Sequence, residues 1–165
     1  MNALMSRRSL LIMGVTAGGT LALGASWRVM GTTAPGAILL STLELDIVEA
    51  AAAVLFPPGL FPSAGGDGKT APEVDRLLAE VIDPPAVGPF RAMLGALEWG
   101  TLISRGTRFS AMPPKEAKEV LDVWASENPF PRRIAFDSLQ AVLAMAFLRR
   151  PEVNAAIGWR AGCFA

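Results

Sequence analysis

The sequence contains no histidine and no tyrosine, and its only cysteine is Cys163. Zinc, copper and c-type haem sites are built mostly from imidazole and clustered thiolates, so a single thiol without imidazole cannot supply them. The same absence excludes Ser-His-Asp and Cys-His catalytic systems. Carboxylates, lysines and water remain for proton transfer, which disfavours an independent enzyme. We therefore expect no cofactor and no catalytic residue in this chain.

The single cysteine also excludes an intramolecular disulfide bond. Cys163 lies near the C-terminus, beside Phe164. We interpret it as a packed apolar thiol, and pairing with another chain is the alternative.

Neither sign of charge dominates the chain, which has 15 Lys+Arg and 15 Asp+Glu in 165 residues. Arg7, Arg8 and Arg28 lie in or beside an N-terminal apolar run, and without them the chain carries 12 basic and 15 acidic residues, a net charge of −3. A mildly acidic body gives no electrostatic reason to expect a nucleic-acid partner. The hydrophobic fraction of 52% is sufficient for a folded core.

The N-terminal segment has the order of a secretory signal. Residues 9–27 are uncharged, and Arg7 and Arg8 precede them. Glycines and threonines dilute the apolar run, and such weak hydrophobicity behind paired arginines is typical of a twin-arginine signal. We therefore predict that the twin-arginine translocase exports the chain to the periplasm, where it associates with the inner membrane.

Whether this N-terminal segment is cleaved or retained as an anchor stays open. Thr32-Thr33-Ala34 is the best late small-x-small cleavage pattern, although a poor one. The 19 uncharged residues are also about long enough to span a bilayer as a helix. We assign residues 1–34 to a signal or retained anchor helix plus linker, and residues 35–165 to a single body.

The body has no useful run of alternating apolar residues, so we predict an all-α fold, a small bundle of about five helices. Capping-box spacings at Ser41 and Thr70, prolines at the helix starts and Gly106 after Arg105 mark the boundaries. The expected helices are residues 42–56, 70–82, 89–104, 113–128 and 133–148. The first should bury Leu45, Val48, Ala52 and Leu55.

The segment Gly65-Gly66-Asp67-Gly68-Lys69-Thr70 contains a local Gly-Lys-Thr. A phosphate-binding P-loop also needs a glycine five residues before the Gly-Lys pair and a preceding buried strand. Ser63 occupies that position, and a helix ending in prolines precedes the loop. We therefore predict a surface loop without a nucleotide.

Five short segments of the body, taken in order, suggest a family. They are residues 54–58 (VLFPP), 71–74 (APEV), 109–116 (FSAMPPKE), 150–153 (RPEV) and 157–159 (IGW). Together with the twin-arginine signal, they resemble the gluconate 2-dehydrogenase subunit 3 family. Its members are the small subunits of membrane-associated, FAD-dependent sugar and alcohol dehydrogenases.

The resemblance implies an accessory role for this chain. In the family, a large subunit of the glucose-methanol-choline (GMC) oxidoreductase type holds FAD, and a separate cytochrome c subunit often accepts the electrons. The small subunit assists maturation of the large subunit, and its signal exports the folded complex. The alternative is a single-span, membrane-anchored structural subunit of another periplasmic or membrane complex.

The predicted partner interface comprises Trp159, Arg160, Phe147 and Leu143. Aromatic and arginine residues are frequent interface anchors, and the helix that contains Leu143 and Phe147 is apolar almost all round. We interpret Trp99 and Trp124 as core residues rather than interface residues. The arginine pairs 132–133 and 149–150 are expected to be solvated helix ends, with ion pairing to a large subunit as the alternative. Glu44, Asp46 and Glu49 are expected to form a polar helix face.

Overall fold

The computed structural model describes residues 31–126 and 130–158. Within these ranges the chain is all-α, as the sequence predicts, with no strand and one isolated bridge between Thr33 and Ser41. The helices are α2 (Thr42–Leu55), α3 (Thr70–Glu80), α4 (Pro84–Arg105), the 3₁₀ turn η1 (Phe109–Ala111), α5 (Pro114–Ser126), α6 (Phe130–Leu148) and α7 (Pro151–Ala156). The predicted signal or anchor at residues 9–27 lies outside the described residues.

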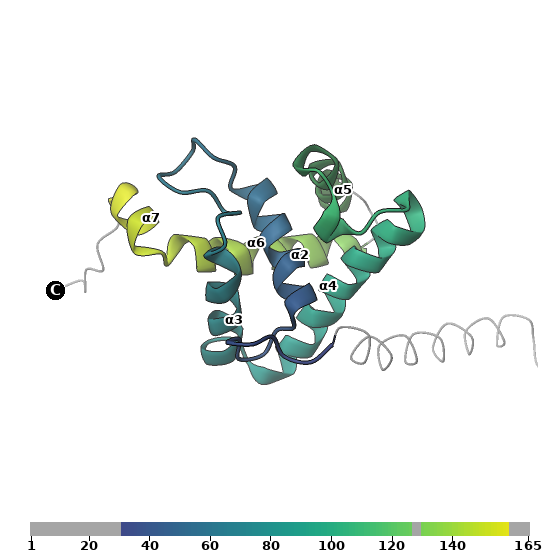
Figure 1. Ribbon diagram of the computed structural model, residues 1–165, viewed down its shortest axis with the longest axis horizontal. Coiled ribbons are helices and arrows are strands. Elements are labelled where there is room, and N and C mark those ends of the chain that lie inside the picture. The colour runs from purple at the N-terminus through teal and green to yellow at the C-terminus, as the bar shows by residue number, and fades with distance from the viewer. Residues whose placement is uncertain (1–30, 127–129, 159–165) are drawn as a thin grey trace, which may run out of the picture.

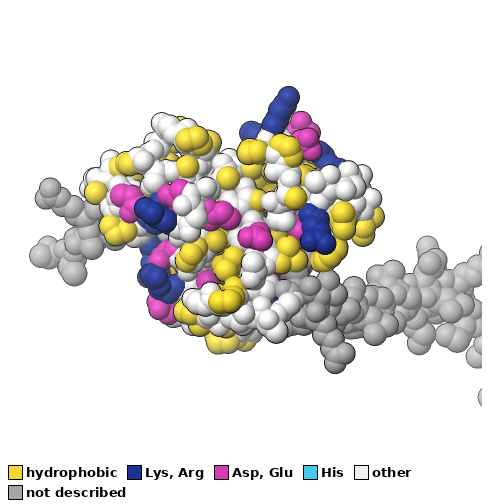
Figure 2. All heavy atoms as spheres, in the orientation of Figure 1, with side chains coloured by type: hydrophobic (Ala, Val, Ile, Leu, Met, Phe, Trp, Pro, Cys, Tyr) yellow, Lys and Arg dark blue, Asp and Glu magenta, His cyan; other side chains and the backbone are white. Residues whose placement is uncertain are grey.

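Helix α2 lies at the centre of the body (Figure 1) and contacts α3, α4, η1, α5 and α6. Helix α4 runs obliquely past α2, and α6 crosses the bundle. In the face shown in Figure 2, acidic and basic side chains lie close together among hydrophobic ones. The core contains most of the residues that the helical spacing of apolar residues predicts: Val74, Leu77, Leu78, Phe90, Leu94, Leu97, Ala117, Val120, Leu121, Leu139, Val142 and Ala146. Val81, which follows the same spacing at the end of α3, is 59% exposed.

The start of α4 and one additional short helix are the main differences from the prediction. Helix α4 begins at Pro84 rather than Pro89. The N–H groups of the first helical residues have no partner within the helix, so prolines, which lack an N–H, fit at these positions. Pro89 then lies inside the helix, at the cost of one backbone hydrogen bond. The short helix α7 was not predicted, because six residues behind Pro151 carry too little periodicity to identify a helix.

The buried face of α2 is rotated relative to the predicted one. Of the four residues predicted to be buried, Val48 and Ala52 are fully buried, together with Ile47 and Ala51, whereas Leu45 and Leu55 are only half-buried. Glu44 lies on this buried face and is also fully buried, although it was expected on a polar surface.

Glu44 can be buried because both of its carboxylate oxygens have charged or polar partners. Arg91 of α4 donates from Nε to Oε1 at 2.6 Å and from Nη2 to Oε2 at 2.9 Å. The backbone N–H and hydroxyl of Ser41 also donate to Oε2, at 2.7 and 2.8 Å, and complete the predicted capping box. One buried carboxylate thus fixes the start of α2 and joins α2 to α4.

Two other buried carboxylates fix segments outside the long helices. Asp75 of α3 accepts hydrogen bonds from the three consecutive backbone N–H groups of residues 38–40, at 2.6 to 3.0 Å. Glu98 of α4 accepts from the N–H and hydroxyl of Ser110, at 2.9 and 2.8 Å, and thereby holds η1. The loops of this small body are therefore positioned by buried charges as well as by apolar packing.

Candidate functional site

An open groove of about 930 Å³ lies between α4, α5 and α6. One row of lining residues is spaced by four along α4, so these residues share one side of the helix. The row contains only small residues: Gly88, Ala92, Ala96, Gly100 and Ser104. A methyl group built on Gly100 would have no neighbouring atom within 4 Å. The floor of the groove is therefore close to bare helix backbone.

The walls of the groove are mainly apolar. Met93 and Leu97 of α4 line it together with Val123 and Trp124 of α5 and Ala135 of α6. Trp124 is half-buried, and Val123 is 39% exposed. Solvent therefore contacts apolar side chains that a binding partner could cover.

Among the described residues, the charged side chains that line the groove are Arg105 at the end of α4 and Arg132 at the start of α6. Glu119, which lies outside the lining, contacts Arg105 at 3.3 Å between Oε2 and Nη1. The groove thus combines an apolar surface with two guanidinium groups, and each of these groups already has an interaction partner within the chain.

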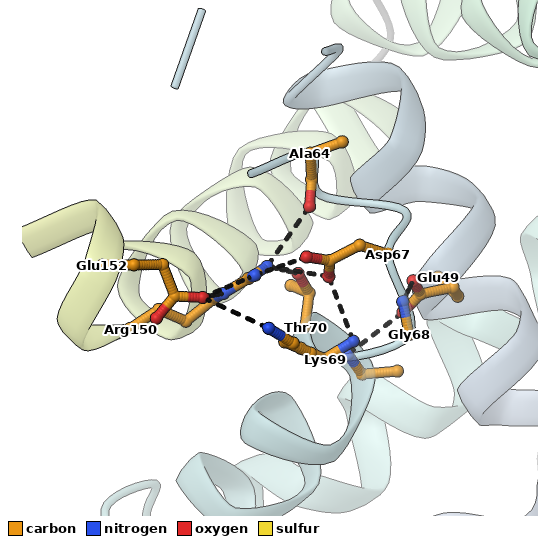
Figure 3. A network of polar contacts seen from close by, with 9 residues as sticks. Glu49, Ala64, Asp67, Gly68, Lys69, Thr70, Arg150 and Glu152 are labelled. Carbon is orange, nitrogen blue, oxygen red and sulfur yellow. Dashed lines mark hydrogen bonds and ion pairs between the residues drawn. The ribbon is translucent and has the colours of Figure 1, made fainter. Parts of the chain in front are cut away.

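A second polar centre lies at the junction of α6 and α7 (Figure 3). The Arg150 side chain is only 5% exposed and donates to Asp67 at 3.0 Å from Nη1 and 2.5 Å from Nη2. It also donates to Glu152, to the carbonyl of Ala64 at 3.2 Å and to the hydroxyl of Thr70 at 3.2 Å. The prediction that Arg150 is a solvated helix end is therefore wrong, because Arg150 ties the glycine-rich loop to the C-terminal helices.

These contacts shift the pKa values of the groups involved. The hydrogen bond from Arg150 holds the pKa of Asp67 below its usual value. The pKa of Glu152 is also lowered, first by its own backbone N–H and then by Arg150. Burial alone would lower the pKa of Arg150, but hydrogen bonds to Asp67 and Glu152 outweigh it and raise the pKa. All three groups are consequently charged at neutral pH.

We expect this network to make the body less stable in acid. A carboxyl group whose pKa is lower in the folded state stabilises the fold above its unfolded pKa, and this contribution is lost as the pH falls through the folded value. The free energy of unfolding should therefore fall from about pH 5 towards pH 3. Urea unfolding over this range should show a smaller pH slope for Asp67→Asn than for the wild type. Equal slopes would contradict the assignment.

The glycines of residues 65–68 serve packing and backbone geometry. A methyl group on Gly65 would lie 2.2 Å from the backbone oxygen of Ala52, and one on Gly66 would lie 2.5 Å from Cβ of Ala53. Gly68 has a φ of 82°, and its N–H donates to Glu49 of α2. The loop thus lies directly on α2, which accounts for its glycines without a phosphate ligand.

Gly65→Ala is expected to destabilise the body by about 1–3 kcal/mol, because the new methyl group overlaps a helix backbone that cannot move aside. Gly100→Ala is the matched control, since it adds the same methyl group in open space within a helix and should stabilise by about 1 kcal/mol. Thermal unfolding of both variants measures the difference. A Gly65→Ala variant as stable as the wild type would contradict the close packing on α2.

Two of the four predicted interface residues are not on the surface. Phe147 and Leu143 are fully buried inside the chain, so the fold gives them no exposed area to offer a partner. This part of the prediction is corrected: α6 is apolar on most sides because it lies among α3, α4, α5 and α2. Trp159 and Arg160 lie outside the described residues.

The other aromatic and charged predictions have mixed outcomes. Trp99 is half-buried, and the guanidinium of Arg108 lies 5.3 Å from its ring centroid. Arg149 is partly exposed and contacts Glu73 at 3.4 Å. The capping box predicted at Thr70 is wrong, because Thr70 is already inside α3 and its hydroxyl accepts from Arg150.

Sequence reasoning missed the groove, although α4 carried a signal for it. Gly, Ala, Ala and Gly at positions 88, 92, 96 and 100 repeat with a spacing of four, which places a smooth stripe on one helix side. Hydrophobic periodicity does not identify such a stripe, because glycine and alanine are weakly apolar. Trp124 was assigned to the core from the same periodicity; it packs against the core while partly buried, and it also lines the groove.

In the described ranges, no three carboxylate or thiol side chains come together as a metal-binding group. None of the helices in residues 31–126 and 130–158 is long and apolar enough to cross a membrane. No protein-family model, curated protein or solved structure matches this chain.

Proposed function

We propose that this chain is the non-catalytic small subunit of a membrane-associated, FAD-dependent sugar or alcohol dehydrogenase complex. It binds the flavoprotein large subunit of the GMC type, assists its maturation and exports the folded complex through the twin-arginine route. The observation that carries the proposal is the open apolar groove between α4, α5 and α6, which leaves Trp124 and Val123 partly exposed. Such a surface is expected of a subunit that is completed by a partner.

The geometry of the segments that suggest the family supports this proposal. Glu73 of the APEV segment contacts Arg149, the residue before the RPEV segment. Arg150 of the RPEV segment contacts Asp67, four residues before APEV. Phe56 of the VLFPP segment stacks on Phe147, with ring centroids 4.3 Å apart. Residues in or near three segments that are far apart in the sequence therefore lie together in the fold.

The export role is tested by replacing Arg7 and Arg8 together with lysines. The translocase reads the arginine pair, and on this proposal the flavoprotein has no export signal of its own. We expect both the small subunit and the flavoprotein activity to remain in the cytoplasm, as measured by cell fractionation. The conservative replacement Arg76→Lys, at an exposed position of α3 outside the groove, should leave export unchanged.

Flavoprotein activity in the periplasm of the Arg7/Arg8 variant would show that the two proteins travel separately. Export of the small subunit itself in that variant would contradict the twin-arginine assignment.

A further inference from the structure

We propose that the N-terminal segment of residues 9–27 is retained as a single-span membrane anchor and is not removed after Ala34. This inference rests on the export route of the proposed function, and it names the part of the chain that attaches the complex to the membrane. It is carried by the fold of residues 31–41, which closes the best late cleavage pattern inside the body.

The cleavage pattern at residues 32–34 lies in a closed turn. The N–H of Ala34 donates to the carbonyl of Leu40 at 2.9 Å, and the carbonyl of Ala34 accepts from the N–H of Ala37 at 3.0 Å. Ala34 is also only 8% exposed. The residue that a signal peptidase would hold directly before the cut therefore has both backbone groups bonded and its side chain covered.

The local sequence favours this turn. Pro35 and Gly36 occupy its two central positions, and Gly36 has a φ of 84°, as the second central position of a type II turn requires. The chain reverses there, and Thr33 forms an antiparallel bridge with Ser41. The ring of Pro35 also lies on the nitrogen of the bond after Ala34 and crowds that bond. The turn and its proline both make the bond a poor substrate.

Buried charges fix the turn to the body. Asp75 of α3 is 3% exposed and accepts hydrogen bonds from the N–H groups of residues 38–40. Ser41 is 2% exposed and donates to Glu44. Figure 1 shows residues 31–40, at the purple end of the colour bar, along the edge of the body beside α3. A peptidase binds the residues around the cut as an extended strand, so this part of the body would have to open first.

The export route determines when the turn forms. On the proposed function, the twin-arginine translocase transports the body already folded, so the turn exists before the segment meets a signal peptidase outside the cytoplasm. A chain exported in the unfolded state would instead present residues 32–34 as open backbone. Retention is therefore a consequence of folding before export.

The segment ahead of the turn meets the requirements of an anchor. Its 19 uncharged residues are about the number that spans the hydrocarbon core as a helix. Two arginines precede it and Arg28 follows it, which favours a cytoplasmic N-terminus and an exported body. The earlier small-x-small pattern Ala22-Leu23-Gly24 lies inside the span, away from a cleavage site at the membrane surface. Only residues 28–30 separate the span from Gly31, so Gly31 lies within roughly 15 Å of its end.

The test is the intact mass of this chain in the complex purified from membranes. We expect the whole chain of 165 residues and 17.4 kDa, which stays with the membranes through an alkaline carbonate wash and is released by detergent. A chain that begins at Pro35, or that has lost any part of residues 9–27, would overturn the proposal. Release of the whole chain by carbonate would also overturn it.

Two insertions between Met30 and Gly31 test the cause of retention. Ala-Gln-Ala-Gly-Ser places a small-x-small pattern ahead of the folded turn, and Leu-Gln-Leu-Gly-Ser is the matched control. We expect the first variant to lose residues 1–30 with the inserted Ala-Gln-Ala and to appear in the soluble periplasmic fraction, whereas the control stays whole in the membrane. A first variant that also stays whole would contradict the role of the turn.

The outcomes separate the two proposals. A truncated chain that still co-purifies with a flavoprotein refutes the anchor and leaves the small-subunit assignment standing. A whole, membrane-bound chain without any flavoprotein refutes the small-subunit assignment and leaves the anchor standing.

Discussion

Phe147→Ala is expected to lower the free energy of unfolding by about 3–5 kcal/mol, the cost of a large cavity in a packed core. The Phe147 side chain is fully buried between two other aromatic rings. It stacks on Phe56 with centroids 4.3 Å apart and meets Phe61 edge-on at 5.3 Å. The guanidinium of Arg150 lies 5.2 Å from the ring centroid, so the aromatic cluster and the ion-pair network share this ring.

The measurement is urea unfolding of Phe147→Ala beside Leu148→Ala. Leu148 is the next residue and is 38% exposed, so its truncation should cost no more than about 1 kcal/mol. If Phe147 were instead an interface residue, its replacement would leave the isolated chain stable and weaken only the complex. That result would contradict its place in the core.

Arg150→Met is expected to destabilise the body by about 2–3 kcal/mol. The methionine keeps much of the apolar packing on Phe147 but removes the guanidinium, so Asp67, Thr70 and the carbonyl of Ala64 lose their donor. Removing one partner of a fully buried ion pair costs about 3–5 kcal/mol, and the 26% exposure of the Asp67 side chain reduces that figure.

The neighbouring arginine provides the control. Arg149 is 44% exposed and contacts Glu73 at 3.4 Å, so Arg149→Met should cost less than about 1 kcal/mol. Both variants are compared by urea unfolding at neutral pH. Equal effects of the two replacements would mean that the Arg150 network contributes no more than a surface ion pair.

The apolar pattern predicted the fold class and most of the helices, because core packing follows the helical period. Val74, Leu77 and Leu78 on α3 are buried as that period requires. Prolines located helix boundaries less well. We expected the third helix to begin at Pro89, whereas Pro84 and Pro85 already form its first residues.

The polar architecture could not be predicted from the same pattern. Glu44 and Arg150 look like surface residues in the sequence, and their burial depends on Arg91 and Asp67, which lie 47 and 83 residues away along the chain. Local periodicity contains no information about such distant partners. Phe147 and Leu143 were assigned to an interface for a related reason, because an all-round apolar helix predicts burial without identifying what covers it.

The central claim, that this chain is the small subunit of a flavoprotein dehydrogenase, is tested most directly by purifying the exported full-length chain from periplasmic and membrane fractions. Mild detergent, light scattering and flavin absorbance then give its mass and cofactor content together. We predict a complex of this chain with one larger polypeptide that carries the flavin absorbance, separable into a colourless small subunit and a yellow large one. A chain recovered without a flavoprotein, or in complex with a protein of another class, would contradict the account.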